Sequence, residues 1–435
     1  MPTDHESIVS YSHSSQRMRY IIFFIPLCII FFLGLFINQK IIWCLYLLLL
    51  AFLLISRQKL VFKPVSILNT LTIPLIWTII LSYSYSFYSN LQGLFYLSIP
   101  MIMIVIGYQI SKYLSLKKIL ILILCVGTLL SITYISIVIF KAGFSAFLSP
   151  YEKARFVVGS GSPVSIFALV ISLYSEKFGI KLFRTSIEKI IFIIINLVAV
   201  YLFASRTYWM VLLIFILIFN INVIIKHQVS LFLLLVAGIV ILMIFPVKLT
   251  GEISTTKGLV FKIFKTFSEI KFSNYESYSD INVHYRGYEA YRAFMTYLDG
   301  NPINLILGNG LGKPVDLKAS VYLAGSYRTI IPWIHNGYFF ILVKEGALGL
   351  LALFLFFFQV FNFGFKNLGR MIDEKRFMSL MIIGSVFSII LTNYVICSMF
   401  TVEMAIILIT IGAFIQILNQ KSYTEIKIPL ADNLL

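Results

Sequence analysis

The chain is poor in charged residues, which make up only 12% of its 435 positions. A soluble domain carries about 25% charged residues, so this deficit excludes an ordinary water-soluble fold. Hydrophobic residues make up 60% of the chain instead, and the mean hydropathy is +0.94. Its apolar runs of about 17–22 residues are long enough to cross a hydrocarbon core as helices. We therefore predict an all-α integral membrane protein whose partner is the lipid bilayer.

Cysteine is scarce as well, and its placement excludes a disulfide framework. The cysteines lie in or beside apolar runs, where they are expected to be small core residues: Cys28, Cys44, Cys125 and Cys397. No cluster of cysteine and histidine has metal-ligand spacing, and we predict no metal and no other cofactor. The first apolar run lacks a small-residue cleavage site, so it is expected to be retained as a first helix.

Acidic residues are also few, with 18 of them against 35 lysines and arginines, which gives a formal net charge of +17. A strong basic excess can indicate nucleic-acid binding. Here, however, most basic residues lie in short loops between apolar runs, where they mark the cytoplasmic side of a membrane protein. The excess therefore indicates topology, and we predict no nucleic-acid partner.

Apolar length predicts about twelve transmembrane helices. They are expected at residues 20–37, 41–55, 65–82, 91–110, 118–140, 157–175, 189–205, 208–225, 229–247, 335–361, 377–396 and 398–418. Every second loop is basic, which predicts that both termini lie in the cytoplasm. The expected order is a cytoplasmic tail (1–19), helices 1–9 (20–247), a large periplasmic loop containing short helices (248–334), helices 10–12 (335–418) and a cytoplasmic tail (419–435).

One short helix of the large loop is predicted at residues 283–298. Its apolar positions follow helical spacing and lie on one face: Tyr291, Phe294, Met295 and Leu298. Asn282 is a candidate N-cap. Arg286 and Glu289 are expected on the opposite, polar face of this helix.

Among the arginines that lie outside the cytoplasmic loops, where the positive-inside rule disfavours them, three are candidates for a function: Arg155, Arg206 and Arg286. Each has a purely structural interpretation. Arg206 would anchor a turn at the membrane interface, Arg155 would pair with Glu152, and Arg286 would pair with Glu289. The alternative is an anion site, because the planar guanidinium fork matches phosphate oxygens.

A His335-Asn336 pair stands where the large loop returns to apolar sequence. A lone histidine is more often structural, but an imidazole at an interface also suits a general base. Asn336 would fix the imidazole tautomer or bind a sugar hydroxyl. Gly346 and Gly349 follow at a spacing of three residues and predict a small-residue face for close helix packing.

Two further features of this region have alternative interpretations. The stretch from Gly308 to Gly312 is either a turn, which the following Pro314 favours, or a loose phosphate loop. Lys344 and Glu345 are unusual inside a span. Either they pair with other helices, or the true span begins nearer Gly346.

The spacing His335-Asn336, nine residues, Gly346, two residues, Gly349 resembles the ligase motif His-[Asn/Ser/Gln]-x9-Gly-x2-[Gly/Thr/Tyr] of the O-antigen ligase/O-antigen polymerase superfamily. Ser205-Arg206-Thr207 resembles the Ser-Arg element after that family's seventh span. Asn301-Pro302 followed by Leu307-Gly308-Asn309-Gly310 resembles its Asn-Pro…Gly-x-Gly element in the outer loop. The predicted arrangement of twelve spans, with one large outer loop between the ninth and tenth, also resembles that of the family.

This resemblance implies a metal-independent glycosyltransferase of the bacterial inner membrane that moves a glycan from undecaprenyl pyrophosphate at the periplasmic face. His335 and Asn336 would be catalytic, and Arg206, Arg286 and Arg155 would bind the pyrophosphate. The full motif favours an O-antigen ligase of lipopolysaccharide biosynthesis, with lipid A-core as acceptor. The alternative is a polymerase that joins lipid-linked repeat units. A polysaccharide transporter or flippase and a membrane scaffold are the hypotheses from other classes.

Overall fold

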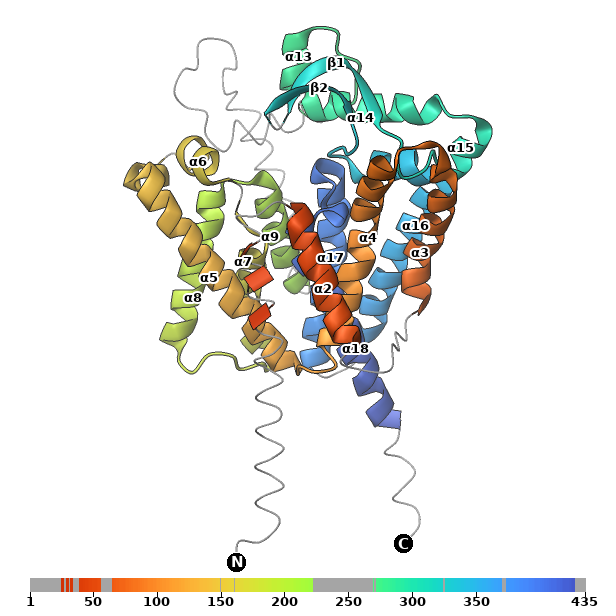
Figure 1. Ribbon diagram of the computed structural model, residues 1–435. Helices are drawn as coiled ribbons and strands as arrows, with labels where there is room; N and C mark the ends of the chain where they lie inside the picture. The colour runs from red at the N-terminus through yellow and green to blue at the C-terminus, as the bar shows by residue number, and fades with distance from the viewer. Residues whose placement is uncertain are drawn as a thin grey trace, which may run out of the picture.

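The computed structural model describes residues 39–55, 65–148, 150–159, 161–221, 271–323, 325–369 and 373–426, together with Glu269 and a few residues between 25 and 33. Within these ranges, seven helices are long and apolar enough to cross a membrane, and two shorter apolar helices accompany them. The chain is therefore a membrane protein built on a helical bundle (Figure 1). The number of apolar helices among the described residues is smaller than the predicted twelve spans. The predicted span 229–247 lies outside the described residues.

Most bundle helices overlap a predicted span. They are α2 (Gln39–Ile55), α3 (Val65–Ile80), α4 (Phe87–Ile110), α5 (Leu116–Ala142), α8 (Ser186–Phe203), α9 (Arg206–Phe219), α16 (Gly337–Leu368), α17 (Asp373–Ile396) and α18 (Ala405–Ile426). The predicted span 157–175 is a regular helix only in α7 (Val164–Tyr174). Its first residues are broken because Gly159 and Gly161 have positive φ angles of 97° and 76°. Before them lie a π-turn, Tyr151–Arg155, and one turn of helix, α6 (Phe156–Val158).

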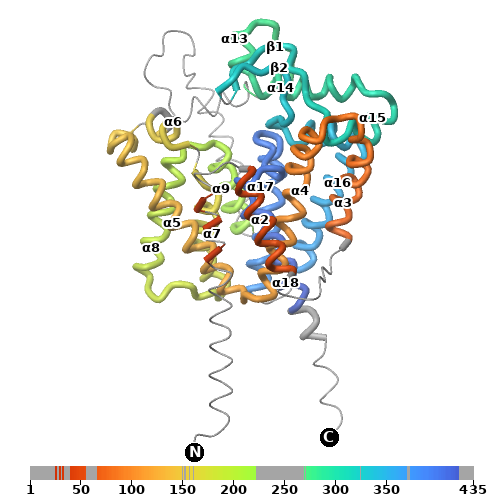
Figure 2. Tube along the Cα trace, in the orientation of Figure 1, coloured from red at the N-terminus to blue at the C-terminus, as the bar shows by residue number. Residues whose placement is uncertain are grey.

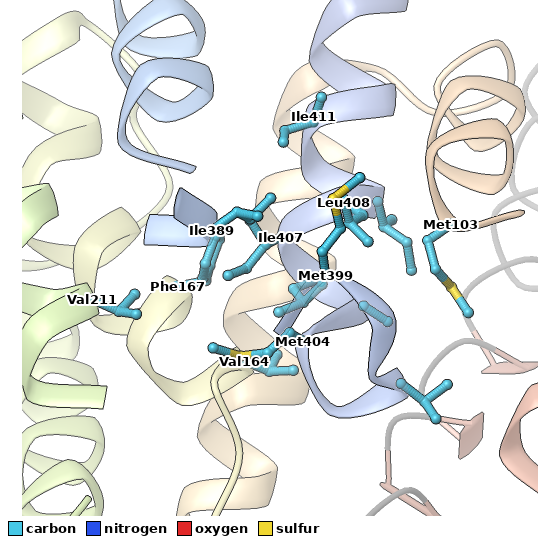
Figure 3. Close-up of a cluster of buried hydrophobic side chains, with 14 of the residues drawn as sticks. Met103, Val164, Phe167, Val211, Ile389, Met399, Met404, Ile407, Leu408 and Ile411 are labelled. Atoms are coloured by element: carbon cyan, nitrogen blue, oxygen red, sulfur yellow. The ribbon is translucent and has the colours of Figure 1, made fainter. Parts of the chain in front are cut away.

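Helices α4 and α18 form the centre of the bundle and approach each other at two glycines. A Cβ on Gly107 of α4 would lie 1.9 Å from the Ile409 carbonyl oxygen, and one on Gly412 of α18 would lie 2.0 Å from that of Ile104. Small residues of this kind let membrane helices pack backbone against backbone. The buried apolar core of the bundle includes Met103, Phe167, Val211, Ile389 and Leu408 (Figure 3). Of the described cysteines, Cys397 is buried, but Cys44 and Cys125 are exposed, contrary to the core prediction.

A small mixed layer covers one end of the bundle, here called the loop end (Figures 1 and 2). It contains three short helices and an antiparallel pair of strands, so the all-α prediction needs correction. These elements are α13 (Tyr278–Val283), α14 (Tyr285–Leu298), α15 (Pro302–Leu307), β1 (Val315–Leu323) and β2 (Ser326–Ile331). Helix α14 is the predicted amphipathic helix, but Asn282 belongs to α13 and does not cap it.

Candidate functional site

Helix α16 begins directly after the His335-Asn336 pair, and Asn336 is its N-cap. The Asn336 side-chain oxygen accepts hydrogen bonds from the backbone amides of Tyr338 at 3.0 Å and Phe339 at 3.2 Å. Such a cap satisfies amide groups that have no partner inside the helix. The expectation that Asn336 fixes the imidazole tautomer is therefore wrong, because its oxygen serves the helix start.

Glu289 of α14 holds His335 instead. One Glu289 oxygen, Oε2, accepts a hydrogen bond from the His335 backbone amide at 2.8 Å and lies 2.9 Å from Nδ1 of its ring. Because a carboxylate only accepts, the Nδ1 atom carries the proton. Among the described residues nothing binds the other ring nitrogen, Nε2, and the His335 side chain is 31% exposed. The pair thus presents a free, oriented basic nitrogen, an arrangement that suits proton abstraction.

The carboxylate of Glu289 is itself enclosed. Its side chain is only 2% exposed, and its second oxygen accepts a hydrogen bond from the Tyr285 hydroxyl at 3.1 Å. Burial, followed by the negative charge of Glu289, raises the pKa of Tyr285, so its hydroxyl stays protonated and donates. Tyr285 also contacts the His335 ring edge-on, with centroids 6.1 Å apart. The sequence did not identify Glu289 or Tyr285 as a partner of His335; Glu289 was expected on the polar face of the helix, paired with Arg286.

The arginines singled out in the sequence gather at the loop end. Arg206 is the first residue of α9 and forms an ion pair with Glu269 at 2.8 Å, with side chains 19% and 22% exposed. The guanidinium of Arg155 donates to the carbonyl oxygen of Ala204, two residues before Arg206, at 3.0 Å. Ala204 adopts a left-handed conformation, with φ of 45°, which sharpens the turn between α8 and α9.

Arg286 of α14 completes this group. Burial lowers the pKa of its guanidinium; Glu269 acts in the opposite direction, and Arg206 and Arg155 lower it further. Glu289 of the same helix also raises this pKa, so Arg286 interacts electrostatically with two carboxylates and two guanidiniums. Among the described residues, its guanidinium makes no hydrogen bond or ion pair, including the ion pair expected with Glu289. We call Arg155, Arg206, Arg286 and Glu269 the arginine cluster. Even with the carboxylate of Glu289 counted beside that of Glu269, the three guanidiniums leave an excess of positive charge, which suits an anionic ligand.

The Gly308 region is a turn and not a phosphate loop. The backbone amides of Asn309 and Gly310 donate to the carbonyl oxygens of Val343 and Lys344, each at 3.1 Å. Those carbonyls lack helical partners because α16 breaks at Gly346, which has φ of 71°. The amides that could hold a phosphate are therefore already used.

Lys344 is paired with the turn rather than with another helix. Lys344 is only 2% exposed. Its ammonium group donates hydrogen bonds to the carbonyl oxygens of Leu311 and Lys313, both at 2.6 Å. Gly346 allows α16 to approach the end of α15 and the turn that follows it. A Cβ there would lie 2.4 Å from both the Ile306 carbonyl oxygen and the Gly308 amide nitrogen.

Helix α14 links the two parts of the candidate site. Arg286 belongs to the arginine cluster, and Glu289, one turn later on the same helix, binds His335. Within the described parts of the chain, no group of three or more His, Cys, Asp or Glu side chains is placed to hold a metal ion. Comparison with protein-family models and with curated protein sequences gives no match for this chain. The geometry of the site therefore carries the functional argument.

Proposed function

We propose that the protein is a glycosyltransferase that moves a glycan from undecaprenyl pyrophosphate to a hydroxyl group at the loop end, on the periplasmic side of a bacterial inner membrane. The observation that supports this most is the pairing of an oriented histidine, His335 on Glu289, with a cluster of three arginines joined to it through α14. A base and an anion site are the two groups that such a transfer needs.

In the proposed reaction, the acceptor hydroxyl donates its proton to Nε2 of His335. Its oxygen forms a bond to the anomeric carbon of the donor sugar while the bond from that carbon to the pyrophosphate oxygen breaks. His335 becomes an imidazolium, which the carboxylate of Glu289 stabilises at 2.9 Å. General-base catalysis of this kind contributes roughly 10²–10⁴-fold to the rate.

The arginine cluster would take the charge of the leaving group. Arg206, Arg286 and Arg155 would hold the pyrophosphate, and the negative charge that develops on its bridging oxygen would be met by fixed guanidiniums. In this structure the carboxylate of Glu269 pairs with Arg206, where a pyrophosphate oxygen would bind. The arginines thus supply the electrostatic stabilisation expected when the C–O bond breaks.

A ligase and a polymerase differ in the molecule that accepts the glycan. The match to the full ligase motif favours an O-antigen ligase that transfers the glycan to lipid A-core. A polymerase is the second candidate, because Arg155 lies on a separate loop from Arg206 and Arg286 and yet belongs to the same cluster. Both enzymes would use the same donor and bind its pyrophosphate with the same arginine cluster.

Surface glycan analysis of a deletion strain separates these candidates. Bare core with polymer left on the lipid carrier indicates a lost ligase, whereas core carrying one repeat unit indicates a lost polymerase. Complementation with His335→Ala should fail, and complementation with His284→Ala, a matched change in the same layer, should succeed. Full-length, surface-attached polysaccharide from His335→Ala at normal protein level would refute the proposal.

A transporter or flippase predicts a different result. Protein reconstituted in vesicles would then move a lipid-linked sugar or another solute across the bilayer without changing any glycosidic bond. Under the proposed function, the same vesicles form a new glycosidic bond on one face, and Arg206→Gln abolishes it. A scaffold, in contrast, tolerates Gln at all three arginines.

A further inference from the structure

Besides its contacts with α14, His335 contacts a second group of aromatic side chains. Trp333 meets the His335 ring edge-on, with centroids 4.9 Å apart. Trp333 stacks in turn on Tyr96 of α4, at 6.0 Å and an interplanar angle of 29°. All three side chains are partly exposed. The candidate base therefore contacts a partly exposed aromatic pair, Trp333 and the Tyr96 of α4 that stacks on it, which is separate from the arginine cluster.

Tyr96 continues a polar stripe on α4. Gln92 and Tyr88 precede it by four and eight residues, so the three side chains share one helix face. The Tyr88 hydroxyl accepts a hydrogen bond from Lys40 of α2 at 3.0 Å. These side chains reach from the start of α4 to the surface beside His335.

The chemistry of the stripe suits a saccharide. Carbohydrate C–H groups pack on the electron-rich faces of aromatic rings, and hydroxyl groups bond to amide and phenol groups, so a few aromatic and polar side chains bind a sugar. The stripe contains rings, an amide and hydroxyls, and Lys40 of α2 lies beside its first tyrosine. Tyrosines that merely anchor a helix at the membrane interface need no such chain of contacts leading to a histidine.

We propose that Tyr88, Gln92, Tyr96 and Trp333 bind the sugar of the acceptor and present its hydroxyl to Nε2 of His335. This inference rests on the proposed function and deepens it. The donor pyrophosphate lies with the arginine cluster, and the acceptor sugar lies along α4. His335 contacts Tyr285, which precedes Arg286 on α14, and Trp333, which stacks on Tyr96 of α4.

The test is steady-state glycan transfer by the full-length protein in lipid nanodiscs. Donor and acceptor glycolipids are extracted from a strain that lacks the gene, and each is varied in turn. Gln92→Ala and Trp333→Phe should raise KM for the acceptor about three- to tenfold, the range for one lost hydrogen bond or packing contact, and leave KM for the donor unchanged. Leu91→Ala, an adjacent exposed position on another face of α4, is the control.

The outcomes separate the inference from the function on which it rests. Wild-type protein that transfers no glycan refutes the proposed function, and the acceptor subsite with it. Active wild-type protein with unchanged acceptor KM in both variants refutes the subsite alone. A parallel rise of donor and acceptor KM, or a lowered melting temperature in both variants, assigns these residues to folding and also refutes it. Tyr96→Phe, which removes only a hydroxyl, covers the case in which Trp333→Phe fails to fold.

Discussion

Glu289→Gln should slow glycan transfer without disrupting the loop end. The carboxylate accepts three hydrogen bonds, two from His335 and one from the Tyr285 hydroxyl. A glutamine of the same shape can keep its oxygen beside His335, while its amide group faces Tyr285, whose hydroxyl can turn to accept. The substitution thus removes a charge and keeps the hydrogen-bond geometry.

The lost charge matters when His335 holds a proton. At a charge separation of about 4 Å and an effective dielectric constant of about 20, the attraction is about 4 kcal/mol. Solvent screens part of it, because the His335 side chain is 31% exposed. We therefore expect a loss of about 2 kcal/mol of transition-state stabilisation, which is roughly 30-fold in kcat.

The assay is the nanodisc transfer reaction with both glycolipids saturating. Glu276→Gln, which removes an exposed carboxylate from the same layer, is the control and should keep the wild-type rate. The double variant with His335→Ala tests the reasoning, because residues that act as a unit give non-additive losses. A rate for Glu289→Gln equal to wild type would refute the reasoning. So would a full additional loss when it is combined with His335→Ala.

Three further changes test other parts of the structure. Arg286→Lys should raise KM for the donor about tenfold, because an ammonium lacks the planar fork, whereas exposed Arg184→Lys should not change it; donor titrations measure both. Glu269→Gln should tighten the binding of inorganic pyrophosphate several-fold in calorimetry, because it removes the anion from the arginine cluster; weaker binding would contradict this. Gly346→Ala should lower the melting temperature far more than Gly325→Ala. Both glycines have positive φ, but only Gly346 would place a Cβ against neighbouring backbone.

The spans and one loop helix were predictable because they follow from general constraints. A bilayer requires long apolar helices, and the predicted spans 91–110 and 118–140 correspond to α4 and α5. The amphipathic spacing likewise predicted α14 to within a few residues at its start. The hairpin also has a signal that was not used: Val315, Leu317 and Val321 alternate on the buried side of β1, ahead of a turn at Gly325.

The partner of the histidine was not predictable from local pattern. Glu289 is three residues from Arg286 on a helix, which indicates a surface ion pair when only neighbours are considered. Its actual partner, His335, is 46 residues away, and only the packing of α14 over the start of α16 joins them. Arg155, Arg206 and Arg286 were identified because positive charge is disfavoured outside the basic loops, but their convergence required the structure.

The nine-residue spacing after Asn336 acquires a physical meaning. Residues 337–345 form a half-helix with Asn336 as its cap at one end. At the other end, Gly346 breaks the helix, and the turn at Gly308 fills the break. The half-helix is therefore fixed at both ends, and its length sets the height and rotation of His335 above the turn. One inserted residue would rotate His335 by about 100° around the helix axis, away from Glu289. Gly308 and Gly346 therefore depend on each other, because a side chain at either position would collide with the backbone of the other segment.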